Sequence, residues 1–173
     1  YRDPSLPTDE RARSYLHANC SHCHRKWGGG NTEFQLLATL PLDELGIAGT
    51  RPAHGGFLLP EAEVLAKGDP LRSVLYYRMA KLGPGRMPRI GSSVVDEEGT
   101  RLIHDWIAGL ASDDADAPED SRDRSRELLA TLRGTADAAE RGAPLAELLS
   151  TTRGALQLML AIDRGEVSAS VRE

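Results

Sequence analysis

The sequence predicts an all-α protein, and three observations support that fold class. Helix starts are visible at Asp69-Pro70 and at Asp96-Glu97, where an aspartate can accept hydrogen bonds from the free N–H groups of the first turn. Apolar side chains recur with the 3.6-residue period of a helix face between residues 102 and 110. The last part of the chain, from residue 121 on, repeats helical patterns of the same kind.

The first helix is expected to begin at Thr8, as its N-cap, and to reach about Cys20. Acidic residues in its first turn suit the helix dipole, and Tyr15 and Leu16 fall on the face that is expected to pack inward. The helix that begins after Asp96 has a broad apolar face that must be buried, and the first helix is its obvious partner. This apolar face consists of Leu102, Ile103, Trp106, Ile107 and Leu110.

Between these two helices the chain is expected to be mostly irregular. A short helix is predicted over residues 33–40, and residues 41–60, which are rich in glycine and proline, are expected to form a loop with room for one tight hairpin. The helix that starts after Asp69 is expected to end at Gly83-Pro84-Gly85. Its inward stripe consists of Leu71, Val74, Leu75 and Leu82, with Met79 alongside.

Composition divides the chain into three parts. Residues 1–110 are predicted to form a helical domain, residues 111–120 an acidic linker without large apolar side chains, and residues 121–173 a helical tail. Helices in the tail are expected at residues 122–140, 144–150 and 152–163.

Charge and hydropathy exclude two classes of partner. The formal net charge is −5 and resides entirely in residues 111–173, and no clustered positive stretch indicates nucleic-acid binding. No apolar run approaches the ~18 residues of a membrane span. The sequence begins with tyrosine and without a secretion signal, which we interpret as a mature chain or an excised piece whose targeting signal lay upstream.

The two cysteines of the chain, Cys20 and Cys23, are followed directly by His24. This C-x-x-C-H pattern is the attachment motif for c-type haem, because two thiols at the spacing of the vinyl groups form thioethers and the adjacent imidazole can reach the iron. A redox dithiol needs a βαβ context and a zinc site needs two further ligands, and the sequence indicates neither. We therefore predict one covalently attached haem c, whose porphyrin also supplies apolar volume to a thin core.

A second axial ligand has to come from elsewhere in the chain. Met87 is the preferred candidate, since it lies in a loop between two helices and Pro88 stiffens the approach of its sulfur to the iron. Met79 lies in an apolar helix stripe and is more typical of core packing. His54 is on a roomy loop, whereas His104 is expected on the polar side of its helix. The remaining candidates, with ordinary structural interpretations, are Met159, His17 and His22.

Further cofactor contacts are predicted around the same loops. Arg51, Arg86 and Arg89 can each pair with a haem propionate, although a solvated surface arginine is the more ordinary interpretation of any one of them. Trp27 can donate its indole N–H to a propionate or cover the haem edge.

Four features in this order resemble class I cytochromes c. They are the helix that ends in Cys20-Ser-His-Cys-His24, the motif Gly68-Asp-Pro-x-x-Ser73, Met87-Pro88, and a closing helix with Asp105-Trp106-Ile107. More narrowly, residues 14–24 and 91–99 resemble the haem domains found at the ends of large planctomycete and other bacterial proteins, where they are often joined to a quinoprotein sugar-dehydrogenase-like propeller. The resemblance covers about residues 8–110.

The resemblance implies a cytochrome c-like helical domain around one covalent haem, with a C-terminal helical extension. It implies thioethers at Cys20 and Cys23, a proximal ligand at His24 and a distal ligand at Met87. It also implies an exported, periplasmic or otherwise extracytoplasmic protein. The glycine-rich loop between residues 31 and 68 is longer than in compact members of the family.

We expect this protein to be an electron carrier and not an enzyme, with His/Met ligation that raises the reduction potential. It would accept electrons from a redox partner protein or from a fused dehydrogenase domain. The first alternative is a haem enzyme or gas sensor with an open, peroxidase-like distal site, which requires Met87 away from the iron and His54 or Arg51 above it. The second is an interaction module in which the linker and tail dock the domain onto a larger assembly.

Overall fold

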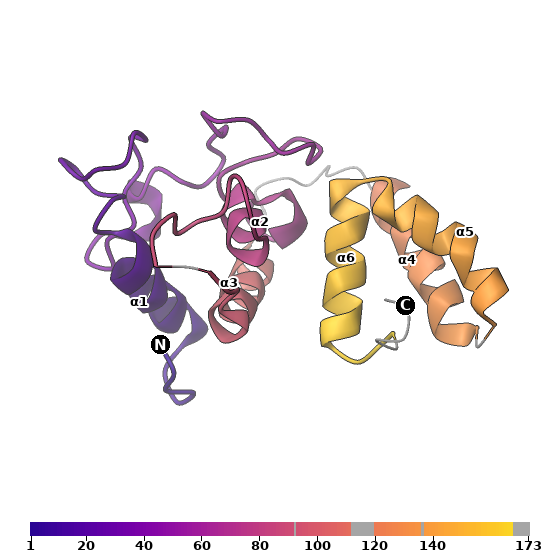
Figure 1. Cartoon of the computed structure of the whole chain (residues 1–173). Helices are drawn as coiled ribbons and strands as arrows, with labels where there is room; N and C mark the ends of the chain where they lie inside the picture. Colours follow the sequence, from indigo (N-terminus) through magenta and orange to yellow (C-terminus); the bar gives the residue numbers. More distant parts are fainter. Residues whose placement is uncertain (92, 112–119, 136, 168–173) are drawn as a thin grey trace. The chain divides into compact units, whose positions relative to one another are not determined.

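The computed structural model describes residues 1–91, 93–111, 120–135 and 137–167 (Figure 1). Within these residues the chain is all-helical, with six α-helices, two short 3-10 helices and two isolated β-bridges, which confirms the predicted fold class. The elements are α1 (Thr8–Cys20), η1 (Leu42–Glu44), η2 (Pro70–Arg72), α2 (Val74–Ala80), α3 (Glu97–Gly109), α4 (Asp120–Gly134), α5 (Ala138–Leu149) and α6 (Thr152–Asp163). No helix of the described residues is long and apolar enough to cross a membrane.

The chain divides into two compact units, which we describe separately. Unit 1 comprises Tyr1–Gly56 and Glu61–Asp113, and unit 2 comprises Phe57–Pro60 and Asp114–Glu173. Most of the predicted acidic linker, residues 112–119, lies outside the described residues.

Unit 1 is built on the pairing of α1 with α3, as the apolar face of α3 predicts. Two polar contacts flank the apolar interface: the Tyr15 hydroxyl donates to Asp96 Oδ2 at 3.0 Å, and Trp106 Nε1 donates to Asp9 Oδ1 at 2.8 Å. The side chains buried on these two helices include Ala12, Tyr15, Leu16, Leu102, Ile103, Trp106 and Ile107. The Asp96 cap is also confirmed, since its carboxylate accepts from Gly99 N at 3.0 Å.

A glycine allows this close approach of α1 and α3. A Cβ atom added at Gly99 would overlap the Tyr15 ring, whereas one added at Gly109 on the same helix would meet nothing within 4 Å. We expect Gly99→Ala to lower the free energy of unfolding by about 1–3 kcal/mol, because the ring must shift from its contact with Asp96. Gly109→Ala is the matched control and should change that free energy by less than about 1 kcal/mol, in the stabilising direction. Urea unfolding measures both, and equal effects would contradict the packing argument.

The start of α1 differs from the prediction by one residue. Pro7 occupies the N-cap position with φ −54° and ψ 143°, no side chain caps the helix, and Thr8 is the first helical residue. The prediction of Thr8 as N-cap is therefore wrong. The reason is that Pro7 already has the non-helical backbone that an N-cap requires and is fixed in φ by its ring.

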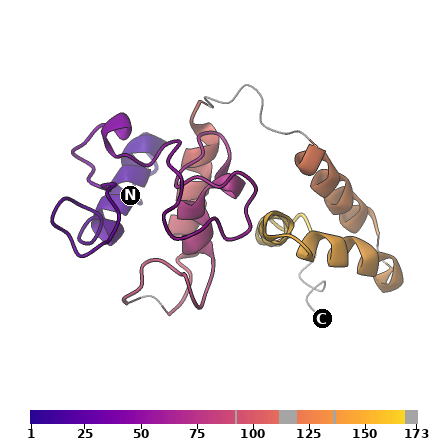
Figure 2. The ribbon, with the colours of Figure 1, turned by 90° about the horizontal axis from the view of Figure 1, so that it is seen from above.

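The connection between α1 and α2 is irregular chain that lies above the helices of unit 1 in Figure 1 and spreads across them in Figure 2. The helix predicted over residues 33–40 does not form, because its N–H groups are used elsewhere: Gln35 N donates to Leu45 O at 2.9 Å and Leu36 N to His24 O at 2.8 Å. A helix of this length is marginal without tertiary support.

Residues 41–60 are irregular, as predicted, but they contain the short helix η1 and pair through a bridge instead of a hairpin. Ala48 forms an isolated parallel bridge with Leu65, so this loop pairs with chain much further along the sequence.

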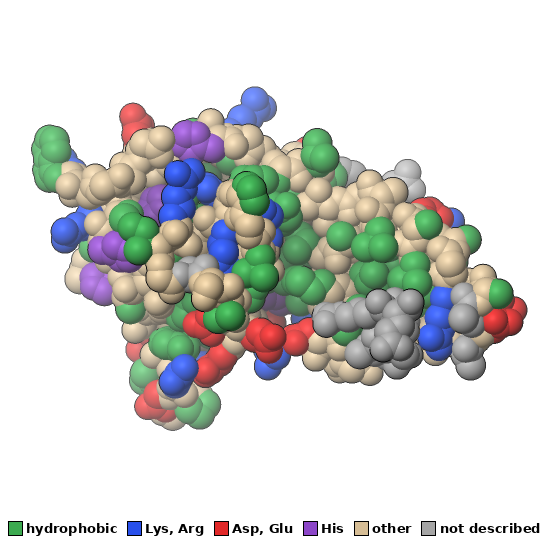
Figure 3. Space-filling view, in the orientation of Figure 1, with side chains coloured by type: hydrophobic (Ala, Val, Ile, Leu, Met, Phe, Trp, Pro, Cys, Tyr) green, Lys and Arg blue, Asp and Glu red, His purple; other side chains and the backbone are tan. Residues whose placement is uncertain are grey.

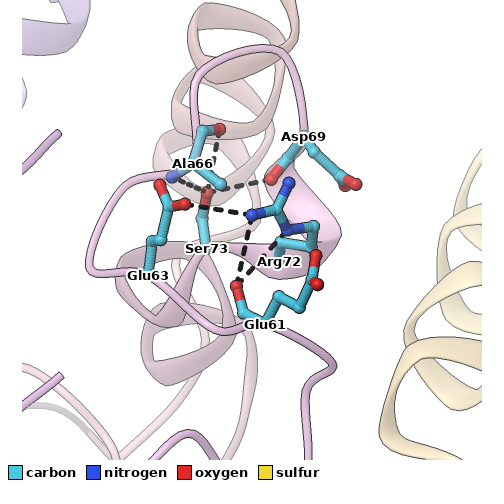
Figure 4. Close-up of polar contacts among 6 residues, drawn as sticks. All are labelled: Glu61, Glu63, Ala66, Asp69, Arg72 and Ser73. Atoms are coloured by element: carbon cyan, nitrogen blue, oxygen red, sulfur yellow. Dashed lines mark hydrogen bonds and ion pairs between the residues drawn. The ribbon is translucent and has the colours of Figure 1, made fainter. Parts of the chain in front are cut away.

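The turn before α2 is held by a polar network (Figure 4). Asp69 caps η2 by accepting from Leu71 N at 3.0 Å, as predicted. The buried Ser73 hydroxyl accepts from Ala66 N at 3.0 Å and donates to Asp69 O at 2.9 Å. Arg72, also buried, pairs with Glu63 at 3.0 Å and donates to Glu61 O at 3.3 Å. These bonds fix the entry into α2 and so the direction of the loop that follows it.

The single helix predicted from Pro70 to Gly83 is divided: Asp69 caps only η2, Ser73 is extended with φ −89° and ψ 111°, and α2 begins at Val74. Helix α2 then ends at Ala80, earlier than the predicted stop. Leu82 is 56% exposed, so its assignment to the inward stripe is wrong. The guanidinium of Arg86 donates to Met79 O at 3.3 Å and to Lys81 O at 2.6 Å. A side chain therefore satisfies carbonyls at the end of α2 where a further helical turn would have done so. The remainder of the predicted stripe is buried or half-buried.

His104 is buried, which corrects its predicted place on a polar face of α3. Its ring lies edge-on to Tyr76 of α2, with ring centroids 5.4 Å apart, and its Nδ1 lies 2.9 Å from Asp105 Oδ1. Helix α3 is packed against α2 as well as against α1, so the face of α3 that is polar in the sequence is also covered.

Unit 2 contains three helices that pack on one another around their own apolar cluster. The cluster consists of Leu128, Leu129, Leu132, Leu148, Leu158, Ala161 and Val167. The helix predicted over 122–140 is interrupted: α4 ends at Gly134, and Asp137 caps α5 by accepting from Ala139 N at 2.9 Å. Helix α5 thus begins six residues before the predicted 144, whereas α6 matches the predicted 152–163.

Candidate functional site

Cys20 is the last residue of α1, and Cys23 and His24 lie in the turn that follows it. Cys23 N and His24 N donate to Cys20 O at 3.1 and 2.9 Å, so the helix end continues as one tight turn. Both cysteines are free thiols and only partly exposed. Burial, and to a lesser extent the neighbouring Cys23, raises the pKa of Cys20 to about 12. Cys20 is therefore a neutral thiol at neutral pH.

The His24 ring is held by two residues of the next loop. Its Nδ1 lies 3.0 Å from Thr32 Oγ1, and the ring stacks on Phe34 with centroids 4.7 Å apart and planes 7° from parallel. Burial, together with the charges of Arg78 and His22, lowers the pKa of His24 below its usual value. The ring is thus kept neutral and oriented through Nδ1, which leaves Nε2 as the nitrogen for a metal ligand.

Glycines shape the loop around this turn. Gly30 N donates to Cys23 O at 3.0 Å, and a Cβ at Gly30 would lie 2.8 Å from that oxygen. A Cβ at Gly28 would collide with the same carbonyl, whereas one at Gly29 would meet nothing within 4 Å. Two of the three consecutive glycines are therefore required by space next to Cys23, and the third is not.

This difference gives a test of the loop. We expect Gly28→Ala to lower the midpoint of thermal unfolding, because the Cys23 carbonyl must move and the turn that carries His24 must move with it. The cost should be about 1–3 kcal/mol, as for other overpacked sites. Gly29→Ala is the matched control and should leave the midpoint within error. Circular dichroism melting of both variants checks this, and a tolerant Gly28 would refute the described loop.

Met87 lies half-buried in the loop between α2 and α3. Its backbone N donates to Arg78 O at 2.9 Å, and Arg78 Nε donates to Gly85 O at 2.7 Å. The charge of Arg78 also contributes to the lowered pKa of His24, so its guanidinium acts on the His24 ring while its carbonyl holds the Met87 loop.

The guanidinium of Arg86 bonds to backbone carbonyls on both sides of the Met87 loop. Besides its bonds to Met79 O and Lys81 O, its guanidinium donates to Val94 O, so it joins the two ends of the Met87 loop. Arg51 and Arg89 remain exposed on their loops. Trp27 is 92% exposed, with the Lys26 ammonium 5.7 Å from its ring centroid.

The other histidines have local partners. His54 Nε2 lies 3.1 Å from Asn31 Oδ1, and Ala38 N donates to His17 Nδ1 at 3.3 Å. His22 is exposed. Met79 is buried in α2, as its helix stripe predicts. Met159 belongs to α6 in unit 2.

Sequence reasoning missed Thr32, Phe34 and Arg78, which position the predicted ligands, and it considered Arg86 only as a propionate partner. Thr32 and Phe34 hold the His24 ring, and Arg78 and Arg86 hold the Met87 loop. No spacing rule connects these residues to the motif, because the contacts depend on irregular loop geometry. A residue whose partner lies in another loop has no periodic signal.

Comparison of the chain with protein-family models, with curated proteins and with solved structures returns no match. Among the residues that the structure describes, no group of three or more His, Cys, Asp and Glu side chains could hold a bare metal ion. The donor set does fit a covalent haem: two free thiols stand at the required spacing, and the adjacent imidazole has its Nδ1 occupied by Thr32.

Proposed function

We propose that unit 1 is a class I-type cytochrome c domain that carries single electrons. The observation that carries this proposal is the arrangement of the C-x-x-C-H turn, with free thiols at Cys20 and Cys23 and a neutral His24 ring held through Nδ1 by Thr32. A ligating histidine characteristically has its second ring nitrogen fixed by such a hydrogen bond.

Each residue of the motif has a distinct task in this proposal. The sulfurs of Cys20 and Cys23 would hold the haem covalently, and His24 Nε2 would bind its iron. The Met87 sulfur would be the second protein ligand, and the bonds of Arg78 and Arg86 hold its loop. When bound, the haem supplies an iron that exchanges one electron.

No side chain of the site needs to act as an acid or base for this function. If two protein ligands held the iron, the chain's own residues would bind the haem, orient it and exclude water from it. The Phe34 ring stacked on His24 contributes to that exclusion. Export from the cytoplasm and a dehydrogenase as electron donor belong to the same proposal.

A redox dithiol is disfavoured by an observation at Cys20. Dithiol oxidoreductases lower the pKa of the attacking cysteine, commonly at a helix N-terminus, whereas Cys20 lies at the C-terminal end of α1 with a raised pKa. The open-site alternative gains no support either, since His54 pairs with Asn31 and Arg51 is exposed on its own loop.

The direct test is to export the chain in cells that carry a cytochrome c maturation system. We expect the purified protein to keep its haem after denaturation and acid–acetone extraction, at one haem per chain. A pyridine haemochrome spectrum should show the band of two saturated vinyl groups. The control is a known c-type cytochrome exported in the same cells. If that control retains haem and the purified chain does not, the proposal is refuted.

A further inference from the structure

Residues 30–36 run alongside His24, and we call this irregular segment the strap. Its two ends are bonded to the chain that carries the ring: Gly30 N donates to Cys23 O at 3.0 Å, and Leu36 N donates to His24 O at 2.8 Å. These bonds fix the backbone of the strap relative to the backbone of the histidine. The strap is thus a support against which the ring is oriented.

A further residue of the strap, Gln35, fastens it to neighbouring chain. Its backbone N donates to Leu45 O at 2.9 Å, and its side-chain Oε1 accepts from Lys26 N at 3.0 Å. Neither bond involves the His24 ring. The strap therefore has anchors of its own and does not depend on the ring for its position.

Two side chains of the strap contact the His24 ring in different ways. Thr32 Oγ1 lies 3.0 Å from Nδ1, whereas the Phe34 ring stacks on the imidazole with centroids 4.7 Å apart and planes 7° from parallel. Both side chains are half-buried. A hydrogen bond acts on the electron density at one ring atom, whereas a stacked ring acts on the plane of the whole imidazole. The two contacts therefore constrain two different properties of His24.

The bond between Thr32 and Nδ1 has a single direction when Nε2 is the ligand atom. A neutral imidazole carries one ring proton, so Nδ1 holds it and donates, and Thr32 Oγ1 accepts. A hydroxyl oxygen is a weaker acceptor than a carboxylate, and the acceptor at Nδ1 determines the basicity of the ligand. The side chain at position 32 thus decides how strongly His24 donates electron density to a metal.

We propose that Thr32 and Phe34 are positioning residues with separate tasks: Thr32 sets the reduction potential through the donor strength of His24, and Phe34 fixes the plane of its ring. The inference rests on the proposed function, since it requires His24 to be the ligand of a haem iron. Hydrogen bonds to an axial ligand are one of the means by which a protein tunes that potential. Because a neutral acceptor stabilises the oxidised iron less than a carboxylate does, Thr32 holds the potential higher than an acidic residue would.

The first test removes the acceptor at position 32 and nearly keeps its size. In Thr32→Val, His24 becomes a weaker donor, and we expect the one-electron equilibrium to shift towards the reduced form by about tenfold, which corresponds to about 59 mV. Thr32→Ser keeps a hydroxyl and should restore the unmodified value. Redox titration of the holoproteins measures these shifts. A potential in Thr32→Val equal to that of the unmodified protein would overturn the assignment of Thr32.

A carboxylate at position 32 should reverse the sign of the shift. Thr32→Asp makes His24 a stronger donor, and we expect the equilibrium to move towards the oxidised form by about tenfold or more. Gln35→Glu is the control for the added charge, because it places a carboxylate on the same strap where Oε1 accepts from Lys26 N and not from His24. It should give a smaller shift in the same direction. Equal shifts in the two acidic variants would reduce the effect to charge and overturn the proposal.

Hydrogen exchange at Nδ1 tests the bond in the unmodified protein. In the reduced, diamagnetic holoprotein the His24 Nδ1 proton should give an NMR signal that exchanges slowly with water, because Thr32 accepts it and Phe34 stacks on the ring. In Thr32→Val the exchange should be about five to ten times faster, as expected for the loss of one neutral hydrogen bond. An unmodified protein whose Nδ1 proton exchanges too fast to be observed would contradict the proposal.

The plane of the ring is tested separately at Phe34. In the proton spectrum of the oxidised holoprotein, the unequal shifts of the haem methyl groups report the plane of the axial imidazole. We expect Phe34→Leu, which removes the stacked ring, to change the order of these shifts, and Phe34→Tyr, which keeps a stacked ring, to preserve it. An unchanged order in Phe34→Leu would overturn the role of Phe34.

Failure of this inference and failure of the proposed function give different results. A chain that retains no haem refutes the electron-carrier proposal, and this inference with it. A chain that retains haem with His24 and Met87 as ligands, but has the same potential with valine, serine or aspartate at position 32, refutes only the role of the strap.

Discussion

A chain in which Cys20 and Cys23 are both alanine is expected to lose the folded structure of unit 1. The long connection between α1 and α2 is irregular and rich in glycine, so ordering it costs conformational entropy that the core of unit 1 has to offset. Without thioethers there is no covalent haem to supply that apolar volume. The loss should exceed about 5 kcal/mol, which is comparable with the whole stability of a small domain.

Tryptophan spectroscopy can measure this loss in unit 1 alone. Both tryptophans, Trp27 and Trp106, belong to unit 1, and Trp106 is buried between α3 and α1 while Trp27 is already exposed. We expect the near-ultraviolet circular dichroism of Trp106 to disappear in the double variant. Gly29→Ala, matured in parallel, is the control for expression and handling. A cofactor-free double variant with an intact Trp106 signal would contradict the prediction.

Replacing Met87 with alanine is expected to remove the sulfur-to-iron charge-transfer band from the oxidised spectrum. The reduction potential should fall by on the order of 0.1 V, within the ~0.8 V range that axial ligands and their surroundings control. The haem should stay attached, because the thioethers do not involve Met87. Visible spectroscopy and a redox titration of the exported variant measure both effects.

Met79→Leu is the matched control for this substitution. Met79 is buried in α2, and a leucine of similar volume should cost less than about 1.5 kcal/mol and leave the charge-transfer band in place. A band that survives in Met87→Ala and disappears in Met79→Leu would transfer the ligand assignment to Met79. A band that neither substitution affects would exclude both sulfurs.

The caps at Asp69 and Asp96 and the bounds of α6 were among the most predictable features of the fold. Asp96 caps α3 and Asp69 caps the short η2, because capping depends on residues that are close in the chain. The apolar period of α3 predicted a buried face and its partner α1 correctly. His104 was misplaced for a related reason: a period identifies one buried face, and α2 covers a second.

The irregular connection was less predictable, and its errors share a physical cause. Residues 33–40 have a local pattern that suits a helix, yet Leu36 N is bonded to His24 O and Gln35 N to Leu45 O. Leu82 continues the apolar period of α2 in the sequence, but α2 ends at Ala80, and Arg86 bonds to the carbonyl of Lys81 that follows it. In each case a distant partner offers a hydrogen bond that local propensity cannot anticipate.

The sequence by itself determined which residues form the candidate site, since C-x-x-C-H specifies three residues through covalent spacing alone. It also determined where most helices start, through caps and apolar periods. Only the tertiary structure decided how the motif is supported: Thr32 and Phe34 at the His24 ring, Arg78 between the two loops. These loop contacts act through space and leave no period in the chain, so no sequence pattern predicts them.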